Sequence, residues 1–118
     1  MDRKHDLIRY KGRSVSSLAI ESVANSHPRV ESSAAFGIES KELSSEHEIM
    51  LAVILKEKDS IKESELANFI FKNAPHFFVP RYIEFLDVLP MTPTNKVRKN
   101  QLRLKGITKN TWDSSFTI

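Results

Sequence analysis

Positions 89–99 read LPMTPTNKVRK. The two prolines fix φ and remove two backbone donors, so this run cannot be the interior of a helix or of a central strand. Asn95 is one of the few residues besides glycine that adopts the left-handed backbone region at low cost. A tight turn at Thr94 and Asn95 would present Lys96 on a stiff loop. Most lone lysines on loops are solvated surface charges, and the rigid frame is what distinguishes this one.

The length and composition of the chain limit its class. It has 118 residues, of which 40% are hydrophobic and 28% charged, and it contains no cysteine. We expect one domain over 1–118 that buries roughly two-thirds of its unfolded surface, because the composition is that of a globular protein. Without cysteine, disulfides and thiolate metal sites are excluded, and no metal site is expected. The chain starts without a signal-peptide pattern, and its longest apolar run, 49–55, is too short to span a bilayer, which predicts a cytoplasmic location.

Charge is distributed unevenly along the chain. Positions 2–13 hold five Lys or Arg residues and two Asp, and positions 96–109 hold six Lys or Arg and no acid. Positions 39–65 reverse the balance, with eight acidic and four basic residues. Basic clusters of this kind meet the phosphates of nucleic acids or of nucleotide cofactors, or they are solvated faces. On charge alone the solvated interpretation is favoured.

The N-terminal part of the chain predicts a hairpin followed by a helix. A strand at 7–10, a turn at Lys11-Gly12 and a return through 14–15 form a small hairpin pattern. Ser16 is a favourable N-cap for a helix over 17–25, in which the apolar residues recur at the spacing of one packed face.

The middle of the chain predicts a sheet with a second helix. The run 30–38 alternates with period two, whereas 49–55 is apolar on both faces, as in a central strand covered on both sides. These two runs are natural antiparallel neighbours. A capping box at 60–63 predicts a helix over 62–73, and 77–85 predicts a third strand.

These elements predict an α+β fold. We expect a three-stranded, mainly antiparallel sheet with helices packed on it and a small N-terminal hairpin. After the Lys96 loop, three apolar residues at 97, 102 and 104 are interspersed among four Lys or Arg residues, which predicts a short basic helix on the surface.

Four segments resemble the adenylate-forming superfamily and, within it, the acyl-CoA synthetases (acid–CoA ligases). The run 89–99 is similar to its C-terminal signature L-P-x-T-x-[ST]-G-K-[IV]-x-[KR], with Asn95 where the family has glycine. Positions 77–85, FFVPRYIEF, resemble the family segment FKVPRYIEF. Positions 2–12 are similar to the linker D-R-x-[KD]-[DE]-x-I-[KR]-x-[KR]-G. The tail, 106–118, begins with a run similar to the G-[IV]-T-x-x-T-W-D ending of carnitine- and crotonobetaine-type ligases.

The resemblance implies roles for seven residues. Lys96 matches the catalytic lysine of the adenylation step. His5, within the hinge or linker segment 1–12, falls where the family places its hinge residue. The residues that match contacts to ATP or coenzyme A are Arg3, Arg9, Lys11, Gly12 and Ser14. Of these, Arg3 and Arg9 match contacts to the nucleotide ribose or phosphates, and the Lys11-Gly12 pair, with Ser14 near it, matches the pantetheine tunnel.

The resemblance covers only the small C-terminal domain of such ligases. We therefore expect a lid, excised or separately encoded, that is inactive alone and works with a large N-terminal adenylation domain. The implied substrates are ATP, with Mg²⁺ held together with that other domain, a carboxylic acid and coenzyme A. The acid is not readable from this chain, because its pocket belongs to the large domain.

Two alternatives remain open at this point. The thiol acceptor could be the phosphopantetheine of a carrier protein instead of free coenzyme A. From a different class, the chain could be a stand-alone basic module that binds nucleic acid or an acidic partner without catalysis. Against the second alternative, no known nucleic-acid motif is present and the aromatic residues cluster where a core is expected.

Overall fold

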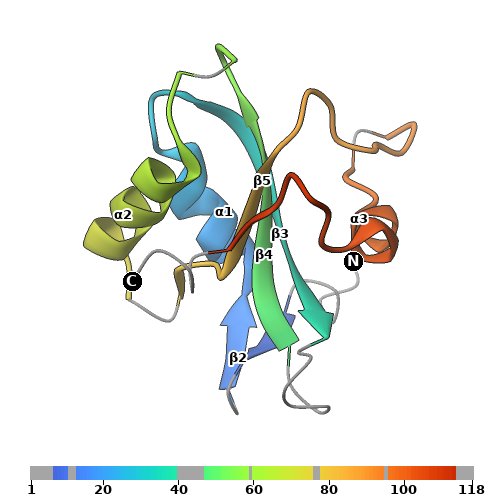
Figure 1. Cartoon of the computed structure of the whole chain (residues 1–118). Coiled ribbons are helices and arrows are strands. Elements are labelled where there is room, and N and C mark those ends of the chain that lie inside the picture. Colours follow the sequence, from blue (N-terminus) through green and yellow to red (C-terminus); the bar gives the residue numbers. More distant parts are fainter. Residues whose placement is uncertain are drawn as a thin grey trace.

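A computed structural model describes residues 7–10, 13–39, 47–58, 60–75, 78–94 and 96–113. Within these ranges, helices pack against a four-stranded sheet and a two-stranded hairpin lies beside it (Figure 1). The elements in chain order are β1 (Leu7–Tyr10), β2 (Arg13–Ser16), α1 (Ser17–Asn25), β3 (Val30–Glu39), β4 (His47–Leu55), α2 (Glu63–Asn73), β5 (Tyr82–Phe85), α3 (Lys99–Lys105) and β6 (Trp112–Asp113). The predicted α+β class is confirmed.

The larger sheet has the strand order β3-β4-β5-β6. β4 is antiparallel to β3 and parallel to β5, and β5 is antiparallel to β6. The parallel pair needs a crossover connection, and the segment that contains α2 supplies it. The predicted pairing of β3 with β4 is confirmed, but the sheet has four strands where the sequence predicted three.

The third predicted strand is shorter than expected, and the additional strand pairs with it. β5 begins at Tyr82, after Pro80, which has no backbone N–H to donate to a ladder, and Arg81, whose N–H donates to the carbonyl of Ile49 at 3.0 Å. β6 is held by Arg81, whose Nη1 lies 2.9 Å from Glu48 Oε2 and whose Nε lies 3.4 Å from Asp113 Oδ1. A strand of two residues has too little pattern to be visible in the sequence.

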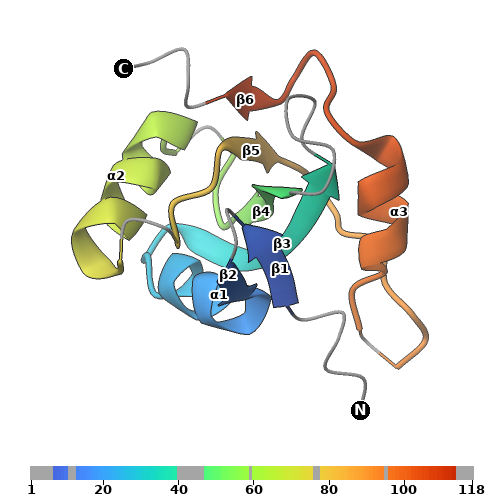
Figure 2. The same ribbon diagram turned by 90° about the horizontal axis from the view of Figure 1, so that it is seen from below.

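The sheet separates two apolar cores. On one face, Ile49, Leu51 and Val53 of β4 pack with α1, α2 and the β1–β2 hairpin. On the other, Met50 and Ala52 pack with β3 residues and with α3. Figure 2 shows α1 and α2 apart from α3, with the sheet between them. The prediction that 49–55 is a central strand covered on both faces is confirmed.

The ends of the helices follow local hydrogen bonding. Ser16 is the N-cap of α1 as predicted, because its Oγ accepts the N–H of Ala19 at 3.2 Å. The capping box predicted at 60–63 is wrong by two residues. Lys62 is the N-cap of α2, and its N–H donates to Glu65 Oε1 at 2.9 Å. The carboxylate of Glu65, two residues after the predicted Glu63, is the one that accepts the N-cap N–H.

The two-core arrangement predicts a large difference between two leucine substitutions. Leu51→Ala removes a fully buried side chain and should lower the free energy of unfolding by about 2–5 kcal/mol. Leu104→Ala, at a side chain that is 88% exposed, should change it by no more than about 0.5 kcal/mol. Urea denaturation of both variants gives the comparison, and equal losses would contradict the assignment of β4 as the buried centre.

Candidate functional site

Lys96 lies on a tight hairpin between β5 and α3. Met91 and Val97 form an isolated antiparallel bridge. The N–H of Thr92 donates to the carbonyl of Lys96 at 2.7 Å, and the N–H of Arg98 donates to the carbonyl of Pro90 at 2.7 Å. The backbone on either side of Lys96 is therefore cross-linked, which confirms the predicted stiff loop. Asn95, at the predicted turn, lies outside the described residues.

Side chains add to the frame of this hairpin. Thr92 Oγ1 accepts the N–H of Lys96 at 3.0 Å, and the hydroxyls of Thr92 and Thr94 share a hydrogen bond at 3.1 Å. Arg98 Nε donates to the carbonyl of Met91 at 3.1 Å. The Lys96 side chain itself is exposed and has no hydrogen bond or ion pair within the described part of the chain. A fixed backbone thus carries a free ammonium group.

Helix α3 continues from the hairpin and is held at both ends. Leu102 is buried in the second core beside Leu89, which precedes the hairpin. At the first residue of α3, Lys99 Nζ lies 2.8 Å from Glu21 Oε2. At the last residue, Lys105 Nζ lies 2.9 Å from Glu84 Oε2. The predicted short basic helix is confirmed, and two of its lysines form ion pairs with other elements.

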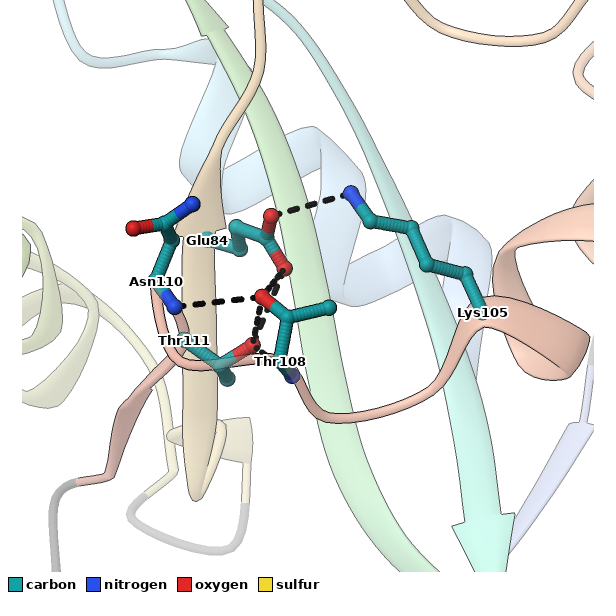
Figure 3. Close-up of polar contacts among 5 residues, drawn as sticks. All are labelled: Glu84, Lys105, Thr108, Asn110 and Thr111. Atoms are coloured by element: carbon teal, nitrogen blue, oxygen red, sulfur yellow. Dashed lines mark hydrogen bonds and ion pairs between the residues drawn. The ribbon is translucent and has the colours of Figure 1, made fainter.

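The Glu84 carboxylate is the centre of a buried polar cluster. Glu84 is 3% exposed, and its Oε1 accepts the hydroxyl of Thr111 at 2.9 Å and, at 3.4 Å, that of Thr108. Figure 3 shows these groups around Glu84, with Lys105 reaching its other oxygen from α3. A buried carboxylate is costly unless its oxygens are paired. The cluster therefore fastens the C-terminal end of α3 and the following turn to β5.

The other residues predicted for the site lie away from the Lys96 hairpin or outside the described ranges. Arg3, His5, Lys11 and Gly12 are outside the described residues. Arg9 in β1 and Ser14 in β2 are register partners in the small hairpin, where Ser14 is exposed. Figures 1 and 2 show this hairpin and the loop before α3 in different parts of the fold. The structure does not bring Arg9 and Ser14 together with Lys96.

Sequence reasoning missed three polar residues: Ser17, Glu21, whose side chain is 14% exposed, and Glu84; the first and last are buried. Ser17 and Glu21 lie one helical turn apart in α1, where Ser17 is buried on the same side as Ile20 and Ala24. That spacing was available in the sequence as a signal. Glu84 interrupts an otherwise apolar strand, which is also a visible signal, but its partners come from residues more than 20 positions away.

No group of three or more His, Asp or Glu side chains in the described residues is arranged to hold a metal ion. None of the helices in that part of the chain is long and apolar enough to cross a membrane. The cytoplasmic location stays a prediction.

Comparison with known families gives the identity of this fold. Residues 19–96 match the family described as AMP-binding enzyme C-terminal domain. The chain belongs to this family. The match begins within α1 and ends at Lys96, so it includes β3, β4, α2 and β5 but not α3.

Named relatives and solved structures agree with this assignment. The domain is 36% identical to trans-cinnamate:CoA ligase of Petunia hybrida over 107 residues, 86% of this chain and 18% of the relative. It is 29% identical to the crotonobetaine/carnitine–CoA ligase of Shigella dysenteriae, over 87% of this chain and 20% of the relative. Amide bond synthetase McbA from Marinactinospora thermotolerans superposes with a TM-score of 0.79 at 25% identity, over 90% of this chain and 21% of McbA. The domain thus spans about a fifth of the length of these relatives.

The hydrogen bonds of the hairpin predict that the Thr92 hydroxyl slows hydrogen exchange at the Lys96 amide. Thr92→Val removes the acceptor of the Lys96 N–H, so exchange of that amide hydrogen should become about 2- to 10-fold faster, the range for one net hydrogen bond. Thr92→Ser keeps the hydroxyl and should leave the rate near that of the unchanged protein. Hydrogen exchange followed by NMR measures both, and equal rates in the two variants would contradict this role.

Proposed function

We propose that this chain is the mobile C-terminal domain of an ATP-dependent acid–CoA ligase, in which Lys96 serves the adenylation step. The observation that carries the proposal is an exposed lysine on a hairpin whose backbone is closed by hydrogen bonds on both sides. Membership of the AMP-binding C-terminal family supports it, as do the CoA ligase names of its curated relatives.

In the proposed first half-reaction, a carboxylate oxygen of the substrate acid attacks the α-phosphorus of ATP. A bond forms between them, the bond to pyrophosphate breaks, and negative charge grows on the phosphoryl oxygens. The ammonium of Lys96 meets that charge without rearrangement of its backbone, a contribution of about 3–4 kcal/mol for a preorganised contact of this kind. We assign the acyl pocket, the phosphate loop and the ligands of Mg²⁺ to the large domain.

In the proposed second half-reaction, the thiol of coenzyme A loses its proton, its sulfur bonds to the acyl carbon, and the bond from that carbon to the AMP oxygen breaks. The domain rotates about the hinge at His5, which removes Lys96 and presents the side of the small hairpin. Arg3 and Arg9 contact the nucleotide, while Lys11 and Gly12, with Ser14 nearby, line the pantetheine path. The separation of the β1–β2 hairpin from the Lys96 hairpin supports the use of two faces in turn.

Coenzyme A is proposed as the acceptor because the curated relatives above are named as CoA ligases. The alternative of a stand-alone module that binds nucleic acid or an acidic partner has no support from the fold. The chain that carries Lys96 belongs to a family of enzyme domains.

The two-face proposal predicts opposite defects in two variants of a ligase that joins this chain to its large domain. Lys96→Ala should lower acyl-adenylate formation about 100- to 1000-fold, because it removes a preorganised charge at the transition state. It should leave the conversion of supplied acyl-adenylate and coenzyme A nearly intact. Gly12→Leu places a side chain in the pantetheine path and should have the opposite pattern.

Each half-reaction is measured alone, by pyrophosphate exchange and by consumption of synthetic acyl-adenylate. Lys109→Ala changes another exposed lysine, on the turn after α3, and should leave both rates unchanged. If Lys96→Ala and Gly12→Leu lost both half-reactions equally while circular dichroism showed an intact fold, the proposed function of the two faces would be wrong.

A further inference from the structure

Lys99, the first residue of α3, lies three residues after Lys96, but its side chain is directed into the protein. Its Nζ lies 2.8 Å from Glu21 Oε2 and donates to Ser17 Oγ at 3.2 Å. The Lys99 and Glu21 side chains are each 14% exposed, and Ser17 is fully buried. Lys96, on the same basic segment, is exposed. The segment thus presents one lysine outward and fixes another inward.

The partners of Lys99 belong to a polar stripe on α1. Ser17, Glu21 and Asn25 follow at intervals of four residues and so lie on one side of the helix. Glu21 Oε2 also accepts the N–H of Ala35 at 2.8 Å, and Asn25 Oδ1 accepts the hydroxyl of Ser33 at 2.8 Å. Both of these donors are in β3, an edge strand of the sheet. Glu21 therefore pairs one backbone N–H of this edge strand, and Asn25 binds one of its side chains.

The Lys99–Glu21 pair joins elements from opposite faces of the sheet. Helix α1 packs in the first core through Ile20 and Ala24, whereas α3 packs in the second core through Leu102. The ion pair connects the two helices past the edge strand β3. Because Glu21 is held by the backbone of β3 as well, Lys99 is attached to a carboxylate whose position the sheet determines.

Within the described residues, the Lys99–Glu21 pair is one of the few contacts that connect the Lys96 hairpin to the rest of the fold. In the described part of residues 91–98, hydrogen bonds join the segment only to itself, to the adjoining Pro90 and to the first turn of α3, where the N–H of Gln101 donates to the carbonyl of Arg98 at 3.0 Å. These bonds set the shape of the hairpin but not its direction from the body of the protein. Its direction depends on the residues at its two ends, Leu89 before it and Lys99 after it, together with the half-buried Val97.

We propose that Lys99 and Glu21 are positioning residues for Lys96, and that their ion pair fixes the direction in which the adenylation lysine is presented. This inference rests on the proposed function, because it concerns the step assigned to Lys96. Neither residue is proposed to touch a substrate. Loss of the pair would free the start of α3, and a displacement of about 1 Å in a catalytic group costs on the order of 100-fold in rate.

The other end of α3 offers a matched control. The Lys105–Glu84 pair has the same chemistry at 2.9 Å, and its carboxylate is more deeply buried. It lies six residues further along, roughly 9 Å at the helical rise, and away from the hairpin. A general loss of stability should follow from breaking either pair. A loss of Lys96 placement should follow only from breaking the first.

The experiment compares Lys99→Met with Lys105→Met in the ligase that joins this chain to its large domain. Both variants should lower the thermal midpoint. Lys99→Met should slow pyrophosphate exchange about 10- to 100-fold with thioester formation unchanged, whereas Lys105→Met should leave both rates within about twofold. Lys99→Arg keeps the charge and should restore most of the exchange rate. Because Lys99 acts through Lys96, adding Lys99→Met to Lys96→Ala should cause no further loss.

The outcomes separate this inference from the function on which it rests. If Lys96→Ala spares pyrophosphate exchange, the proposed function fails. If Lys96→Ala lowers exchange as expected but Lys99→Met behaves like Lys105→Met, or adds its full effect to that of Lys96→Ala, the positioning role alone is overturned. Should Lys99→Met not fold, Glu21→Gln gives the same test. It keeps an acceptor for the Ala35 N–H, and an exchange rate equal to that of Glu84→Gln would overturn the proposal.

Discussion

The burial of β4 on both faces is the constraint on which the rest of this domain depends. Its residues alternate between two cores, so each face of the sheet must be covered by other elements. α1 and α2 cover one face. The other face is covered by α3, which directly follows the Lys96 hairpin. The hairpin is therefore attached to the sheet by an element whose own position is set by the second core.

Much of this fold could be predicted from the sequence because its signals are local. The alternation of 30–38, the apolar run of 49–55 and the capping serine at Ser16 each report the environment of their own segment. The missed features are pairings between distant segments. β6 is two residues long and is held by Arg81, and the parallel direction of β5 follows from the crossover through α2. Neither leaves a periodic pattern in its own residues.

The candidate site divides in the same way. Prolines and a resemblance to a signature were enough to single out Lys96 and to predict a stiff loop, because a turn is determined by its own residues. The partners of Lys99 and Glu84 were not predicted. The sequence around a charged residue does not indicate which distant residue of opposite charge it will contact in the fold. Arg3, His5, Lys11 and Gly12 are outside the described residues, so the roles assigned to them stay predictions.

The contact between Lys99 and Ser17 joins residues 82 positions apart, which has a consequence for the order of folding. Contacts of long sequence separation close large loops and tend to form after local ones. During synthesis, α1 and β3 leave the ribosome before α3, so the carboxylate of Glu21 can be fixed against Ala35 while Lys99 is still being added. The carboxylate of Glu21 can then be in place before Lys99 has been synthesised. Docking of α3 through Lys99 can therefore follow the pairing of β3 with β4, while β6, which is made after α3, completes the sheet later.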